Sequence, residues 1–155
     1  MAKTNVVRIL EAGKIIHYTF EYEVNEDELD AVSVADKINA EHEQVFKTLI
    51  AQNEKKENFV FCIPGNYELD LKKAARASGN KKIELIKVKD ILSITGYIRG
   101  GCSPIGMKKL LPTYIDETAQ LFDEIYISAG VRGMQVKLSP YKLAEIINAN
   151  FADII

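Results

Sequence analysis

Apolar and polar positions alternate over several stretches of the chain, and a period of two predicts β-strands. Residues 16–24 carry Ile, Tyr, Phe, Tyr and Val on one face and polar side chains on the other, which predicts a half-buried strand. Residues 45–50 and 59–64 are rich in β-branched and aromatic side chains and flank a charged turn, so they predict a β-hairpin. Residues 125–128 and 134–138 predict a second hairpin around a glycine-containing turn.

Helical spacing combined with capping residues predicts short helices between these strands. The first helix has an apolar stripe of Val6, Val7 and Leu10, and Gly13 follows where a left-handed residue would end it. The residues that we expect to begin helices are Thr4, Ser33, Asp70, Asp116 and Ser139.

The chain has 155 residues, of which 47% are hydrophobic and 27% charged, so it is long enough for one buried core. We therefore expect a single domain over residues 1–155. Because several successive strands are joined by short turns, antiparallel pairing should dominate. The predicted fold class is mixed α/β (α+β), with a largely antiparallel sheet that curls into a barrel and helices outside it.

The formal net charge of -2 argues against a broadly basic surface that coats nucleic acid, so any RNA contact would come from a local patch or from a partner. Cys62 and Cys102 are too few for a disulfide framework. The sequence shows neither a secretory signal nor an apolar stretch of about 20 residues that could cross a bilayer. We expect a soluble cytoplasmic protein without membrane contact.

The residue types needed for most hydrolase mechanisms are missing from this sequence. Only His17 and His42 are present, and neither stands in a Ser-His-Asp or Cys-His pattern. There is no H-E-x-x-H motif, no Cys/His cluster and no P-loop lysine sequence. We therefore expect no metal and no cofactor.

One loop, residues 95–109, combines glycine with apolar flanks in the pattern T-G-Y-x-x-G-G-x-S-P-x-G-x-K-K. We call it the glycine loop. Gly100 and Gly101 can adopt backbone angles that other residues avoid, so they can turn successive N–H groups into one concave surface and let a ligand approach the main chain. The spacing alone fits an ordinary glycine-rich turn between two strands equally well.

A lysine interrupts an apolar strand face upstream of the glycine loop. Alternation places Lys47 on the same face as Val45 and Leu49, where a cation is costly unless it is paired. From its position alone, Lys47 fits either a functional cation or an inward charge that protects an edge strand from aggregation.

The glycine loop and the lysine strand together resemble the YbaK/EbsC family of aminoacyl-tRNA deacylases, which are related to the editing insertion of bacterial prolyl-tRNA synthetases. The resemblance extends over essentially the whole chain and continues through residues 69–73, 111–116 and 125–133. It implies a barrel-like α/β fold and a trans-editing hydrolase that removes a misattached amino acid from tRNA. Relatives that prefer cysteinyl-tRNA often carry an aliphatic residue at the position of Cys102 and an acidic one near Gln135.

The resemblance also implies which residues form the pocket. We expect catalytic roles for Lys47, Gly100 and Gly101 and substrate contacts from Tyr22, Thr48, Ser103 and Ser128. Basic residues in one helix and around the glycine loop could neutralise tRNA phosphates, although a solvated helix face explains the helical ones as well. These candidate tRNA-binding residues are Lys72, Lys73, Arg76, Arg99, Lys108 and Lys109.

The scissile bond would be the ester between the amino acid and the terminal ribose, which needs mainly oxyanion stabilisation and a positioned attacker. In the mechanism that the resemblance implies, the thiol of a cysteine substrate attacks, and the leading hypothesis is a Cys-tRNA(Pro) deacylase. Cys102 is the alternative nucleophile. The other functional hypotheses are release of alanine or serine, and a catalytically silent module that binds aminoacyl-tRNA. Prolyl-tRNA synthetase is the candidate partner by resemblance.

Overall fold

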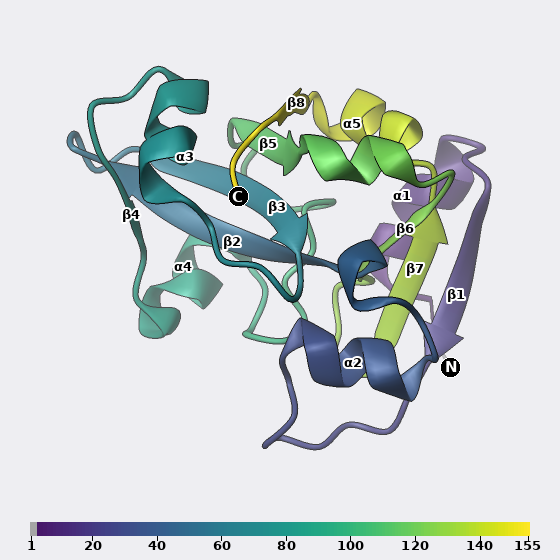
Figure 1. Cartoon of the computed structure of the whole chain (residues 1–155). Coiled ribbons are helices and arrows are strands. Elements are labelled where there is room, and N and C mark those ends of the chain that lie inside the picture. Colours follow the sequence, from purple (N-terminus) through teal and green to yellow (C-terminus); the bar gives the residue numbers. More distant parts are fainter. Residues whose placement is uncertain (1–2) are drawn as a thin grey trace.

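The computed structural model describes residues 3–155, and two β-sheets form its centre (Figure 1). The smaller sheet is antiparallel and holds three strands in the order β1 (His17–Glu21), β7 (Met134–Leu138) and β6 (Ile125–Ser128). The larger sheet holds five strands in the order β4 (Ile83–Leu85), β2 (Phe46–Asn53), β3 (Asn58–Pro64), β5 (Thr113–Asp116) and β8 (Asn150–Ala152). In it, β3, β5 and β8 are parallel, while β2 pairs antiparallel with β3 and β4.

The predicted fold class is confirmed as mixed α/β with largely antiparallel pairing. The structure has two sheets rather than one, however, and they meet at a parallel bridge between Val45 and Tyr126. Closure into a barrel is not confirmed by this strand pairing. Strand β8 was not predicted, because its three residues are too few to show a period.

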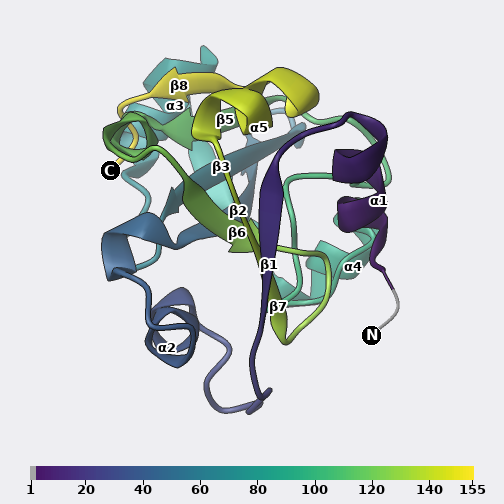
Figure 2. The same ribbon diagram turned by 90° about the vertical axis from the view of Figure 1, so that its right-hand side faces the viewer.

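Five helices surround the sheets in the described part of the chain: α1 (Asn5–Ala12), α2 (Ala31–Lys37), α3 (Leu71–Ser78), α4 (Ile91–Thr95) and α5 (Pro140–Ile147). Short 3₁₀ turns cover His42–Gln44, Val88–Asp90 and Glu117–Leu121. Figures 1 and 2 show α5 and α2 near opposite ends of β1, with α3 beside the larger sheet and α1 beside the smaller one. None of the helices within residues 3–155 has the length and hydrophobicity to cross a bilayer.

Most of the predicted helix starts are confirmed by side-chain caps. Thr4 accepts a hydrogen bond from the Val7 N–H, Asp70 caps α3, Asp116 caps the turn after β5, and Ser139 caps α5. Two details were wrong. The cap of α2 is Asp30, which accepts from both the N–H and the hydroxyl of Ser33, so the helix begins three residues earlier than predicted. Gly13 has φ of -81°, and the left-handed residue is Lys14 with φ of 54°.

Three apolar clusters form the core. The largest lies where the two sheets, α1 and α5 meet, and a second lies under α3. A third, smaller cluster of Ala35, Val45 and Tyr126 lies under α2. The apolar face of β1 is less buried than predicted, since Ile16 is 75% and Tyr18 52% exposed. Among the residues of that face, Phe20 packs against this third cluster.

Candidate functional site

The candidate site forms where two parallel strands separate. Val45 precedes β2 and pairs with Tyr126 of β6, but the two strands make no further ladder after this bridge in residues 3–155. Strand β4 covers only Ala51–Asn53 of the same edge of β2. The edge at residues 46–49 is therefore free of a strand neighbour and is open to a ligand.

A cavity of about 270 Å³ opens at this free edge, and we call it the edge cavity. Five parts of the chain form its walls: α2 with the two residues before it, the free edge of β2, Gly65 after β3, the glycine loop, and the facing ends of β6 and β7. Lys47 and Thr48 point to opposite faces of β2, yet both line the cavity because it wraps around the edge. Its polar lining residues are Asp30, Lys47, Thr48, Arg99, Ser128 and Gln135.

The backbone of Thr48 also faces the edge cavity. Val45 O accepts a hydrogen bond from Gly65 N on the β3 side, and Ile50 O accepts one from Ile86 N on the opposite side. Since the direction of backbone groups alternates along an antiparallel strand, the N–H and C=O of Thr48 point away from β3. The free edge thus offers a backbone donor and an acceptor beside the Lys47 side chain.

Lys47 is a half-buried cation with few partners. Its Nζ donates a hydrogen bond to Gly65 O at 3.2 Å. Burial lowers the pKa of the Lys47 ammonium, and the negative charges of Glu68 and Asp30 partly offset this effect. An ammonium has three N–H donors, so two of them remain for a ligand in the cavity.

Gly100 brings the glycine loop to the cavity wall. Its φ of +87° lies in the left-handed region, which favours glycine. A Cβ at this position would lie 3.3 Å from Leu29 Cδ2 in the cavity wall and 3.4 Å from the side chain of Arg132. Glycine fits at position 100 because its backbone is left-handed and because Leu29 and Arg132 leave little space for a side chain there.

Gly101 faces a different neighbour and does not line the edge cavity. Its N–H donates to Ile98 O at 3.0 Å within the loop. A Cβ on Gly101 would lie 3.2 Å from backbone atoms of Val131 and Arg132, so the residue packs against the β6–β7 turn. Of the two glycines, Gly100 is the one placed to meet a ligand in the cavity.

Ser128 and Gln135 are opposite each other in the β6–β7 ladder and form the wall across from β2. They are 8% and 5% exposed. Ser128 Oγ accepts a hydrogen bond from Gly130 N at 3.3 Å. Gln135 Oε1 is buried and has no hydrogen-bond partner among the described residues. Leaving a buried acceptor unpaired is costly, so a donor brought into the cavity would relieve this cost.

Cys102 lines the cavity, but its environment does not favour a thiolate. Burial raises the pKa of the Cys102 thiol to about 11, although a hydrogen bond with Thr95 opposes the shift. Neither histidine lines the cavity: His17 Nδ1 contacts Ile15 O, and His42 Nε2 contacts Asp36. The thiol therefore lacks a base that could activate it.

Two expected substrate contacts, one expected catalytic residue and most of the expected tRNA contacts lie elsewhere. The edge cavity contains Lys47, Thr48, Gly100, Ser128 and Arg99 of the predicted residues. Ser103 is fully buried and its Oγ accepts from Ile105 N, while the Tyr22 N–H donates to Gly133 O. The predicted residues outside the lining of this cavity are Tyr22, Gly101, Ser103, Lys72, Lys73, Arg76, Lys108 and Lys109.

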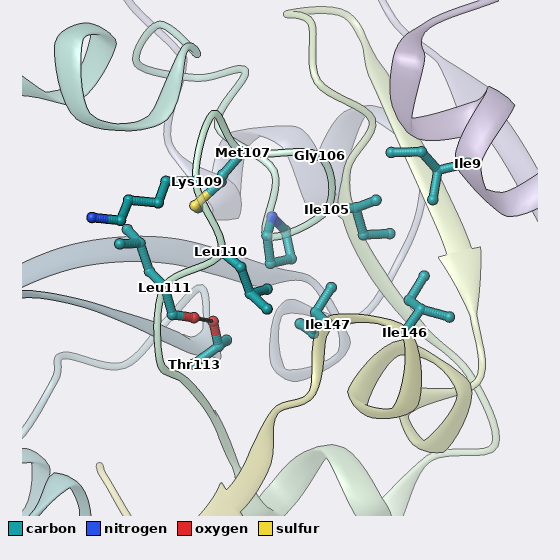
Figure 3. Close-up of a pocket in the computed structure, with 11 residues that line it drawn as sticks. Ile9, Ile105, Gly106, Met107, Lys109, Leu110, Leu111, Thr113, Ile146 and Ile147 are labelled. Atoms are coloured by element: carbon teal, nitrogen blue, oxygen red, sulfur yellow. Dashed lines mark hydrogen bonds between the residues drawn. The ribbon is translucent and has the colours of Figure 1, made fainter.

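A second cavity, of about 230 Å³, lies between the distal part of the glycine loop, α1 and α5 (Figure 3). Its walls are almost entirely apolar: Ile105, Leu110 and Ile147 are among the side chains that Figure 3 shows around it. Lys109 is the one ionisable residue in its lining. Because this cavity offers few polar groups for chemistry, it is a weaker candidate for an active site than the edge cavity.

Sequence reasoning missed Asp30 and did not assign Gln135 to the pocket. In β7, Gln135 and Lys137 alternate with apolar residues as in an ordinary half-buried strand, so the sequence pattern does not mark Gln135 as a pocket residue. Asp30 is not marked either, because the loop that precedes α2 is acidic throughout. In residues 3–155, no group of three or more His, Cys, Asp or Glu side chains is arranged to hold a metal ion.

The chain matches a known family at this point. Residues 25–146 match the aminoacyl-tRNA editing domain, and the protein belongs to this family. The matched range contains the glycine loop and every residue that lines the edge cavity.

Individual relatives agree with this assignment. The chain is 50% identical over 152 residues to EbsC of Enterococcus faecalis, a proposed Cys-tRNA(Pro)/Cys-tRNA(Cys) deacylase. These 152 residues cover 98% of this chain and 93% of the relative. The crystal structure of a proposed trans-editing enzyme for prolyl-tRNA synthetase has a TM-score of 0.81 at 26% identity, covering 99% of this chain and 98% of that one. A proline–tRNA ligase of Brachyspira hyodysenteriae is 28% identical over 97 residues, which are 62% of this chain and 17% of the ligase.

Proposed function

We propose that this protein is an aminoacyl-tRNA deacylase that acts in trans and hydrolyses the ester of misacylated tRNA, with Cys-tRNA(Pro) as the leading substrate. Membership of the editing family and the 50% identity to a proposed Cys-tRNA deacylase support this activity. The observation that carries the assignment of the site is the edge cavity, where Lys47, Gly100 and Ser128 surround an open strand edge. We place the activity in the cytoplasm and in one domain over residues 1–155.

The cavity offers the two kinds of group that ester hydrolysis needs. In this proposal the Thr48 N–H at the free strand edge and the Gly100 N–H in the glycine loop donate to the ester oxygen as it becomes negative. Lys47 adds a positive charge in a partly dehydrated setting, where its attraction for an oxyanion is stronger than in water. Ser128 orients the amino acid from the opposite wall.

The nucleophile in this proposal comes from the substrate. The cysteine thiol attacks the carbonyl carbon of its own ester, the bond to the ribose oxygen breaks, and the thiol proton goes to that oxygen. Water then opens the resulting cyclic thioester to free cysteine. Support comes from the raised pKa of Cys102 and from the absence of histidine in the cavity lining, which leave the chain's own thiol unactivated.

The choice of tRNA requires contacts beyond the aminoacyl end, and we propose that prolyl-tRNA synthetase provides them. The similarity to part of a proline–tRNA ligase supports this partner. Addition of the synthetase should raise deacylation of Cys-tRNA(Pro) more than that of Cys-tRNA(Cys), and an equal effect on both would contradict the proposal.

A panel of aminoacyl-tRNAs charged with cysteine, alanine, serine or proline tests the activity. With enzyme well below substrate concentration, we expect many turnovers on Cys-tRNA(Pro) and few on correctly charged Pro-tRNA(Pro). Preferred release of alanine or serine would replace the leading substrate. Tight binding without release of any amino acid would instead identify a silent binding module.

A further inference from the structure

Two arginines flank Gly100 at the mouth of the edge cavity. Arg99 lines the cavity, and Arg132 belongs to the turn between β6 and β7. The Arg132 Nε–H donates to the backbone oxygen of Arg99 at 2.8 Å. This bond holds the Arg132 side chain against the glycine loop. A Cβ added to Gly100 would lie 3.4 Å from Cγ and from Nε of Arg132.

Both guanidinium groups are available for an anion. In the part of the chain that the structure describes, neither has a carboxylate within 4.0 Å. Of the basic residues predicted to bind tRNA, Lys73 is paired with a carboxylate, because its Nζ lies 3.1 Å from Asp153 Oδ1. Arg99 and Arg132 are therefore two positive charges next to Gly100 that have no carboxylate partner among the described residues.

We propose that Arg99 and Arg132 together bind the phosphodiester on the 5′ side of the terminal nucleotide of tRNA. The inference rests on the proposed function, because an ester in the edge cavity places the terminal ribose at its mouth. The nearest charged group of the RNA is then the phosphate of that same nucleotide. Arginine suits this contact, since its planar fork can donate two hydrogen bonds to phosphate oxygens.

The position of Arg132 gives this contact a second effect. Its side chain is bonded to the glycine loop, and its backbone lies against Gly101. A phosphate held by Arg132 and Arg99 would therefore fix the loop that carries Gly100 relative to the β6–β7 wall that carries Ser128. The phosphate contact positions the two sides of the cavity around the ester and is not itself catalytic.

The test compares two small substrates that differ only in the phosphate: an aminoacyl ester on the 3′-oxygen of adenosine and the same ester on adenosine 5′-monophosphate. The amino acid is the one that the wild type releases fastest. We expect wild-type kcat/KM to favour the phosphorylated substrate by at least about tenfold, as one charge-assisted contact would give. Arg99→Gln and Arg132→Gln should each reduce this ratio, and the double variant should bring it close to one.

Salt dependence of deacylation of intact aminoacyl-tRNA gives an independent readout. Each lost phosphate contact on single-stranded RNA should reduce the slope of log(kcat/KM) against log salt by about 0.7. Arg132→Lys should keep the wild-type slope because it keeps the charge. Arg8→Gln, which removes an exposed arginine on α1, is the matched control and should change neither readout.

The outcomes separate this inference from the proposed function. If the wild type hydrolyses neither intact aminoacyl-tRNA nor the small esters, the proposed function fails. If it hydrolyses intact tRNA but the arginine variants keep the wild-type salt slope, the phosphate contact is wrong. The phosphate contact would also be wrong if the double variant kept the wild-type ratio of kcat/KM between the phosphorylated and the unphosphorylated small substrate.

Discussion

Replacing Gly101 by alanine should destabilise the protein before it affects the chemistry. The added Cβ would lie 3.2 Å from Arg132 N, Val131 C and Val131 Cα, all of which are backbone atoms of the β6–β7 turn. A flexible side chain could move aside, but this turn is tied into the β6–β7 ladder and has to shift as a unit. Gly101 has no positive φ, so the cost is overpacking alone, about 1–3 kcal/mol.

This cost can be measured by thermal unfolding. For a protein of this size, 1 kcal/mol corresponds to a Tm change of about 2–4 °C, so a loss of about 2 kcal/mol lowers Tm by about 4–8 °C. Gly13→Ala is the matched control, because its Cβ would come closest to the flexible Ile15 side chain, at 3.3 Å, and would be in ordinary contact with Ile9 O at 3.5 Å, while Gly13 itself has φ of -81°. It should change the free energy of unfolding by no more than about 0.5 kcal/mol.

The sequence analysis assigned Gly101 a catalytic role, and in that role an added Cβ would obstruct the ester and lower turnover more than stability. The packing of Gly101 against Val131 reverses this order. Well below the Tm of the variant, kcat/KM per folded molecule should fall less than it does for Gly100→Ala, since Gly100 lines the cavity. An unchanged Tm with strongly reduced kcat/KM would refute the reasoning and place Gly101 against the substrate.

Three further substitutions test the roles of single cavity residues. Lys47→Met should abolish most deacylation yet raise Tm near pH 7, because burial disfavours the charged lysine in the folded protein. The gain in Tm should shrink as pH rises toward 10.5, where the unfolded lysine also loses its charge. A gain in Tm that does not change with pH would contradict this explanation. Cys102→Ala should remain active, whereas cysteinyl-tRNA with a methylated thiol should react far more slowly; the reverse result would make Cys102 the nucleophile. Gln135→Leu should keep or raise Tm, because it removes an unpaired buried acceptor. It should reduce kcat/KM for cysteinyl-tRNA more than kcat/KM for alanyl-tRNA. An equal reduction for both substrates would exclude a contact between Gln135 and the side chain of the amino acid.

The parts of the fold that follow from neighbouring residues could be predicted from sequence. The β2–β3 hairpin, the β6–β7 hairpin and the capped helices α3 and α5 are as expected, because their determinants lie within a few residues of each other. The division into two sheets was missed. It depends on which strands meet across long separations, such as Cys62 of β3 beside Ile115 of β5, and no local pattern records such pairs.

The site was predictable in the same uneven way. Lys47 and Gly100 break the pattern of their surroundings, one as a cation in an apolar strand and the other as part of a glycine pair, and the structure places both at the edge cavity. Gly100 and Gly101 are indistinguishable in sequence, however. What separates them is the β6–β7 turn: its backbone lies against Gly101, whereas Gly100 meets only the Arg132 side chain of this turn and also lines the cavity.

The separation of β2 from β6 explains why the cavity lies where it does. Two parallel strands that paired along their whole length would bury the backbone of Thr48 in a ladder and leave no room beside Lys47. Here the pairing stops at Val45 and Tyr126, and two residues further along each strand stand Lys47 and Ser128 on opposite walls of the cavity. A strand edge left open in this way normally invites aggregation, and the inward cation is a known protection against it. The protective and the functional explanations of Lys47 are therefore compatible, because an open edge with a charge beside it is also what an ester with a developing negative oxygen requires.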